Sequence, residues 1–71
     1  MTIQDALNHG FNKVKCDRKL KHATTEIGKI SQIRENGISV DFGSGWNFWF
    51  WAKDGEDKRK RYMSWLTPIN K

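Results

Sequence analysis

Two kinds of side chain that bind nucleic acids gather in the second half of this 71-residue chain. The segment 46–51, Trp-Asn-Phe-Trp-Phe-Trp, is aromatic at five of its six positions, and a run of four basic residues follows it at 58–61. Lysine and arginine neutralise phosphate and release its counterions, while exposed aromatic rings stack on bases. The pattern predicts a binding surface made of Trp49, Trp51, Lys53, Lys58, Arg59, Lys60 and Arg61.

A second group of cations lies in the segment 11–22, which connects the N-terminus to the rest of the chain. Against a single acid, Asp17, it carries Lys13, Lys15, Arg18, Lys19 and Lys21. Such a charge run is typical of a solvated loop, and long loops are also where binding residues sit. Phe11, Val14 and Cys16 leave open a short strand within it. We include its cations in the candidate binding surface.

The sequence gives little indication of a metal site or of a reactive cysteine. His9, Cys16 and His22 stand at spacings of seven and six, and no Cys-x-x-Cys or His-x-x-x-His pair occurs. Neighbouring cations would lower the pKa of the Cys16 thiol. A domain this small offers no evident substrate pocket around it, so we expect neither a metal site nor a catalytic cysteine.

Other catalytic signatures are also missing from the sequence. Gly43-Ser44-Gly45 lacks the following Lys-Ser/Thr of a phosphate-binding loop. The acids Asp54, Glu56 and Asp57 adjoin the four basic residues at 58–61, and charge compensation explains them better than acid–base catalysis. We therefore expect a protein that is not an enzyme, with no cofactor and no small-molecule substrate.

Two turns decide which aromatic rings face the core. Asn36-Gly37 predicts a two-residue type I′ hairpin, in which Glu35 faces Ile38. A three-residue loop at 43–45 then pairs Val40 with Phe48. The core face of the next strand becomes Trp46, Phe48, Phe50 and Ala52, and the outer face becomes Asn47, Trp49, Trp51 and Lys53. A loop shorter by one residue would exchange the two faces.

The other elements are predicted from caps and spacing. Residues 2–9 are expected to form a helix, with a Thr2 cap, Asp5 in its first turn, and an apolar face of Ile3, Ala6 and Leu7. The apolar spacing of three between Thr24 and Glu35 predicts a strand with a bulge or bend near Gly28. A last strand beginning within 58–66 would place Arg59 and Arg61 on one side and Lys58 and Lys60 on the other. The N-terminal helix or the segment 11–22 could instead cover Trp49 and Trp51 as a second small core.

Length, charge and cysteine content set the class of protein. A chain of 71 residues is expected to form one domain, residues 1–71. With 13 Lys and Arg against 8 Asp and Glu, its net charge of +5 favours a polyanionic partner. One cysteine, Cys16, and the absence of a long apolar run favour a cytoplasmic protein without a membrane span.

The order of these elements resembles the SH3-like small barrels, including KOW and Tudor-like modules. The segments 28–33 and 38–42 look like the G-x-I/V-x-x-I…I-x-V-x-F pattern of such barrels, and residues 65–69 are similar to their closing single-turn helix and last strand. The resemblance covers residues 24–70. It implies a mainly β fold, a five-stranded bent barrel with a short N-terminal helix, and a binding module.

Two functions follow as expectations. The first is nucleic-acid binding with weak sequence preference, through the basic edge and the exposed tryptophans. The alternative is a protein-interaction module, such as an accessory or inhibitor protein of phage or mobile-element type. It would dock on a host complex for transcription, DNA processing or defence, because Trp and Arg are common interface hot spots. Self-association through Trp49 and Trp51 is a variant of the second function.

Overall fold

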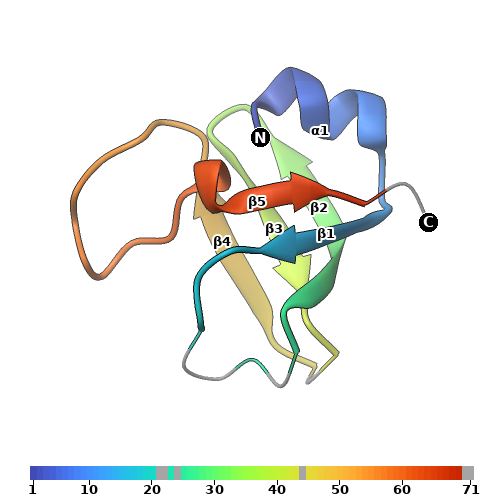
Figure 1. Ribbon diagram of the computed structural model, residues 1–71. Coiled ribbons are helices and arrows are strands. Elements are labelled where there is room, and N and C mark those ends of the chain that lie inside the picture. Colours follow the sequence, from blue (N-terminus) through green and yellow to red (C-terminus); the bar gives the residue numbers. More distant parts are fainter. Residues whose placement is uncertain (21–22, 24, 44, 70–71) are drawn as a thin grey trace.

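The protein is mainly β, with one antiparallel five-stranded sheet and one short helix, as predicted. The computed structural model describes residues 1–20, 23, 25–43 and 45–69. Its elements are α1 (Ile3–His9), β1 (Lys13–Cys16), β2 (Ile27–Arg34), β3 (Gly37–Asp41), β4 (Asn47–Trp51), the single 3-10 turn η1 (Met63–Trp65) and β5 (Leu66–Pro68). The strand order is β4-β3-β2-β1-β5, so β4 and β5 are the two edges and the sheet is not closed into a barrel (Figure 1).

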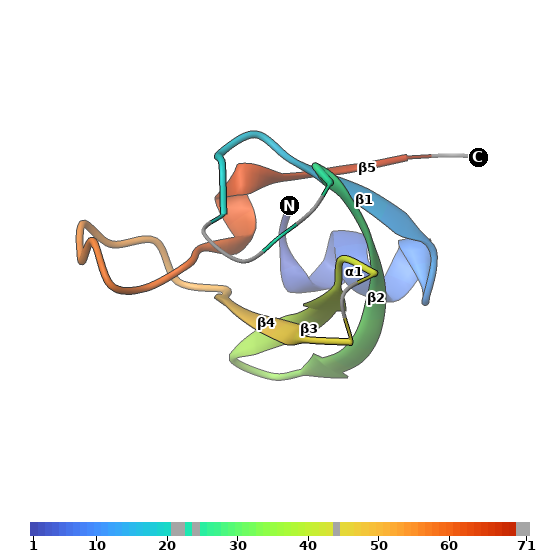
Figure 2. The ribbon, with the colours of Figure 1, turned by 90° about the horizontal axis from the view of Figure 1, so that it is seen from below.

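The sheet curves strongly along β2. In Figure 2, β1 and β5 form one wall while β3 and β4 form the opposite wall. The pairing of β2 with β3 shifts between Ile30 and Gln32, so the bulge lies at Ser31 rather than at Gly28, on a strand that bends as expected. Gly28 serves a close approach instead, because an added Cβ would stand 2.7 Å from a Val40 methyl carbon.

The turn between β2 and β3 differs from the predicted hairpin. Arg34 pairs with Gly37 and Ile33 with Ile38, so the turn residues are Glu35 and Asn36. Gly37 is not among the glycines with positive φ, and no described non-glycine residue has positive φ, which excludes the type I′ turn. The sequence signal failed because Gly37 is a strand residue, required by packing against β4 rather than by the turn.

The hairpin from β3 to β4 has the predicted register. Val40 faces Phe48 and Ile38 faces Phe50, and both Gly43 and Gly45 have positive φ in the loop. Phe48 and Phe50 are buried in the core, as expected. The core position predicted for Trp46 was wrong: its side chain is 59% exposed, because β4 begins one residue later and Trp46 belongs to the loop.

Helix α1 closes one open end of the curved sheet (Figures 1 and 2). Thr2 and Asp5 form the predicted capping box, and the helix ends at Gly10 with φ of 71°. Ala6 is fully buried in the core cluster with Phe50, whereas Leu7, which lines a shallow pocket with Ile3 and Ile33, is 58% exposed, so the predicted apolar face is only partly buried. Since Phe50 points to the inner side of β4, α1 does not form a second core over the outer-facing tryptophans.

The segment 52–61 is a protruding loop rather than the start of a strand. The Trp51 N–H donates to the Arg61 carbonyl at 2.8 Å, and an isolated parallel bridge joins Trp51 to Tyr62, so the two ends of the loop meet. The predicted alternation of the basic residues at 58–61 was therefore wrong. The last strand is β5, which pairs with β1. The predicted strand start at Thr24 lies outside the described residues.

Candidate ligand-binding surfaces

Four predicted residues meet on the outer side of β4, and we call them the tryptophan surface: Trp49, Trp51, Lys53 and Lys60. The two indole rings contact edge to face, with centroids 5.7 Å apart and an interplanar angle of 85°. The Lys60 ammonium lies 5.4 Å from the centre of the Trp51 ring. Lys53 and Lys60 line one shallow pocket of about 320 Å³ with Trp51. The surface therefore combines a half-buried aromatic pair with two cations.

Gly37 determines how Trp49 lies on this surface. Trp49 faces Ser39 and Trp51 faces Gly37 across the ladder, as the register predicted. The expectation that these small neighbours leave the rings uncovered was only partly right. An added Cβ on Gly37 would stand 2.6 Å from the Trp49 ring, so the ring lies across the glycine and is half-buried. The Trp49 indole N–H is buried without a hydrogen-bond partner in the part of the chain that the structure describes.

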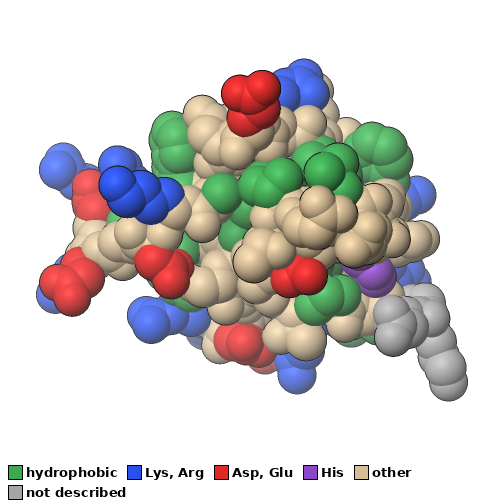
Figure 3. Space-filling view, turned by 90° about the horizontal axis from the view of Figure 1, so that it is seen from above, with side chains coloured by type: hydrophobic (Ala, Val, Ile, Leu, Met, Phe, Trp, Pro, Cys, Tyr) green, Lys and Arg blue, Asp and Glu red, His purple; other side chains and the backbone are tan. Residues whose placement is uncertain are grey.

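The rest of the basic run 58–61 does not join the tryptophan surface. Lys58 and Arg59 are exposed in the protruding loop, where Arg59 stands 3.8 Å from the Asp57 carboxylate. The Arg61 guanidinium lies 4.8 Å from the centre of the Phe48 ring, which belongs to the core side of β4. The loop, at the left of Figure 3, carries basic and acidic side chains together. The four basic side chains therefore do not alternate between the two faces of a strand.

The cations of the first segment are dispersed. Lys13 and Lys15 alternate with the buried Val14 and Cys16 and project outward from β1, on the wall opposite β4 (Figure 2). Lys15 stands 3.9 Å from the Glu26 carboxylate. Arg18 and Lys19 follow β1 and are exposed, and Lys21 lies outside the described residues. The short strand left open by the sequence is confirmed as β1, but a joint surface with Trp49 and Trp51 is not observed.

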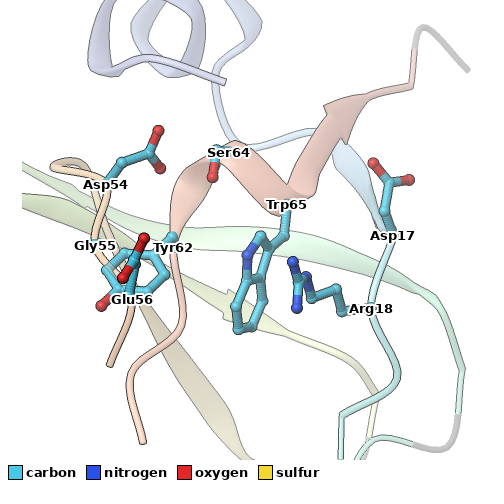
Figure 4. Close-up of a pocket in the computed structure, with 8 residues that line it drawn as sticks. All are labelled: Asp17, Arg18, Asp54, Gly55, Glu56, Tyr62, Ser64 and Trp65. Atoms are coloured by element: carbon cyan, nitrogen blue, oxygen red, sulfur yellow. The ribbon is translucent and has the colours of Figure 1, made fainter. Parts of the chain in front are cut away.

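Arg18 lies in a second site, which the sequence did not predict and which we call the groove (Figure 4). Its guanidinium is 4.9 Å from the centre of the Trp65 ring, and Tyr62 contacts Trp65 edge to face at 5.8 Å. The groove has a volume of about 680 Å³ and is lined by Asp17, Arg18, Asp54, Gly55, Glu56, Tyr62, Ser64 and Trp65. Tyr62 and Trp65 stand three residues apart around the single turn η1, and this spacing is the signal that could have paired them.

The groove is acidic on a basic protein. Among the described residues, Asp17, Asp54 and Glu56 make no ion pair, since the recorded pairs are those of Glu26 and Asp57. The expected compensation of the acids by the neighbouring basic run therefore holds for Asp57 alone. Three unpaired carboxylates against one guanidinium give the groove a negative balance, and such a site favours a cationic ligand.

Cys16 and His9 each make a contact with a backbone carbonyl, and His22 lies outside the described residues. Burial raises the pKa of the Cys16 thiol, which donates a hydrogen bond to the Arg18 carbonyl at 3.2 Å. The charge of Arg18 lowers this pKa as expected, but burial outweighs it, so the net shift is opposite to the prediction. His9 Nε2 lies 2.6 Å from the Lys13 carbonyl oxygen. No group of three or more metal-binding side chains occurs among the residues described, and no helix there is long and apolar enough to cross a membrane.

Comparison with known proteins gives no relative. Neither the family models, nor the curated proteins, nor the solved structures contain a match to this chain.

Proposed function

We propose that this protein binds nucleic acid, with weak sequence preference, on the tryptophan surface. The observation that carries the proposal is the Lys60 ammonium above the Trp51 ring, next to the edge-to-face contact of Trp51 with Trp49. A base can stack on a half-exposed indole while the adjacent ammonium neutralises its phosphate. Both interactions tolerate any base, so discrimination between sequences is expected to be weak.

Single-stranded nucleic acid suits this surface better than a duplex. Stacking on Trp51 requires a base face that a duplex keeps inside its own stack. The described surface carries no helix that could enter a major groove, since α1 lies at the end of the sheet. Lys58 and Arg59 are exposed in the protruding loop, where they could contact further phosphates of a bound nucleic-acid strand.

A fluorescence titration with single-stranded and duplex DNA of mixed sequence tests the proposal. Tryptophan emission is expected to be quenched by the single strand at low salt, and log affinity is expected to fall linearly with log salt. Absence of binding to either nucleic acid at low salt would overturn the proposal.

We also propose a fold family and a cellular location for the protein. We propose an SH3-like architecture, supported by the strand order β4-β3-β2-β1-β5 and by the 3-10 turn directly before β5. The unpaired Cys16 supports a reducing, cytoplasmic environment, where nucleic acid is accessible.

A second candidate function is recognition of a basic segment of another protein, and the groove favours it. The aromatic floor of Tyr62 and Trp65 and the three carboxylates suit a lysine or arginine side chain. Arg18 already holds this position on Trp65 from within the chain. If the groove binds a basic peptide, Arg18 competes with that peptide for the Trp65 ring. Arg18→Ala should then strengthen binding of a short arginine-rich peptide, measured by calorimetry. Weaker peptide binding by this variant would contradict that function.

A further inference from the structure

Strand β4 has an open edge along its first half. The Trp51 N–H points away from β3, since it donates to the Arg61 carbonyl. Backbone groups two residues apart in a strand point the same way, so the N–H and C=O groups of Asn47 and Trp49 also point away from β3. In the described part of the chain, no backbone hydrogen bond from Asn47 or Trp49 crosses this edge. The backbone of residues 61 and 62 therefore covers only the Trp51 end, and the Arg61 side chain extends to the Phe48 ring on the core side.

The two edges of the sheet are protected very differently. Edge strands are commonly blunted by shortness, charge or proline. Strand β5 has three residues and ends in Pro68. Strand β4, Asn-Phe-Trp-Phe-Trp, has neither proline nor charge, although charged residues make up 30% of the chain. An unprotected aromatic edge in so polar a protein indicates a strand that pairs with another.

We propose that β4 pairs antiparallel with β4 of a second copy about a two-fold axis at Phe48. In this register Asn47 of one copy exchanges hydrogen bonds with the partner's Trp49, and the reverse pair does the same. It uses the open backbone groups of both residues and leaves the Trp51 bond to Arg61 in place. The result is a continuous sheet across both copies.

A second copy fits this edge because the pairing is self-complementary: the same two residues, Asn47 and Trp49, supply the open backbone groups on both sides. The paired strand itself carries no charge, although the Arg61 guanidinium lies 4.8 Å from the Phe48 ring, so the two Arg61 side chains would approach the axis. Asn47 and Trp49 point to the outer side, so both tryptophan surfaces come to lie next to each other on one face. This pairing does not depend on the proposed function, but it would double the length of nucleic acid that the proposed surface can contact.

Sedimentation velocity from micromolar to millimolar protein tests the pairing, together with amide exchange by NMR. We expect the mass to double with concentration, and the Asn47 and Trp49 amides to become protected in parallel. Each copy carries a net charge of +5, so salt should strengthen self-association while it weakens nucleic-acid binding. This opposite salt dependence separates failure of one proposal from failure of the other.

Two variants with a matched control complete the test. Asn47→Pro removes an outward N–H at the first residue of β4, where proline is tolerated, and is expected to abolish the dimer without unfolding the chain. Asn47→Lys keeps the backbone and adds an edge charge, with the same expected loss. Thr67→Lys adds that charge to the β5 edge and should leave the dimer intact. A monomer at millimolar concentration, or a dimer that survives Asn47→Lys, would overturn the proposal.

Discussion

The tryptophan surface and the groove are built from the same local chemistry and differ in their charges. Each holds two aromatic rings edge to face, at 5.7 Å and 5.8 Å, with a cation over one ring at 5.4 Å and 4.9 Å. Two lysines and one acid, Asp54, line the pocket beside Trp51, whereas three acids and one arginine line the groove. The aromatic pairs alone therefore do not distinguish the two sites, and we expect the neighbouring charges to decide which ligand each one binds.

The tryptophan surface and the groove adjoin each other at the base of the protruding loop. Asp54, Gly55 and Tyr62 line the pocket beside Trp51 and also line the groove. Variants at matched positions in the two sites can test whether they act independently.

The largest expected effect is on stability, at the two glycines beneath the aromatic rings. In Gly37→Ala the new methyl group would meet the Phe50 carbonyl and the Trp49 ring, so we expect a loss of about 1–3 kcal/mol in the free energy of unfolding. In Gly55→Ala it would meet the Tyr62 hydroxyl at 2.7 Å, at an exposed loop that can shift, so a smaller loss is expected. Urea denaturation measures both, and equal losses would contradict the central role of Gly37.

The next effect is on nucleic-acid affinity. Trp51→Ala removes the stacking ring and is expected to cost about 1–3 kcal/mol of binding free energy for single-stranded DNA. Trp65→Ala removes the matching ring of the groove and should leave this affinity unchanged. Fluorescence anisotropy of labelled DNA measures both variants. A comparable loss from Trp65→Ala would mean that the two sites are not separate.

A smaller effect is expected on the salt dependence. Lys53→Gln and Lys60→Gln should each lower the slope of log affinity against log salt by about 0.7 for a single strand, if each contacts one phosphate. Lys19→Gln removes the same charge beyond β1, away from the tryptophan surface, and serves as the control. The assignment fails if Lys19→Gln changes the slope as much as the other two.

The smallest effect concerns Cys16, which directly precedes the groove residues Asp17 and Arg18. The pKa of the buried Cys16 thiol is raised, so its reaction with a disulfide reagent should be slower than that of an unfolded chain. The unfolded chain loses the thiol proton at a lower pH than the folded chain. This contribution to stability is therefore complete below the unfolded pKa and is lost as the pH rises through the folded one. Rates of Cys16 labelling by the disulfide reagent, measured between pH 7 and 10 for the folded and the unfolded chain, test this expectation. Equally rapid labelling of the folded chain would indicate that the segment after β1 opens.

The sequence predicted the parts of the fold that depend on local pattern. The alternation of Ile38, Val40 and Phe42 with polar residues, together with a three-residue loop, gave the correct register for β4. The Thr2 capping box gave α1. Both signals lie within a few residues of the structure that they specify, so no long-range information was needed.

The errors concern glycines and loops whose role is set at long range. Gly37 has the local signature of a turn, but its conformation is set by the Trp49 ring, twelve residues later in the sequence. The basic run 58–61 was predicted to lie in or beside a strand. The hydrogen bond from the Trp51 N–H to the Arg61 carbonyl instead closes residues 52–61 into a loop. The groove was missed because it joins residues from both ends of the chain around a single 3-10 turn.

The loop 52–61 can tolerate changes in sequence and length because its two ends are joined at its base. Because the Trp51 bond to Arg61 and the bridge to Tyr62 fix its ends, the residues between them can change in number and charge at little cost in chain entropy. Mutations there could reverse the charge preference of both neighbouring sites at once without disturbing the sheet.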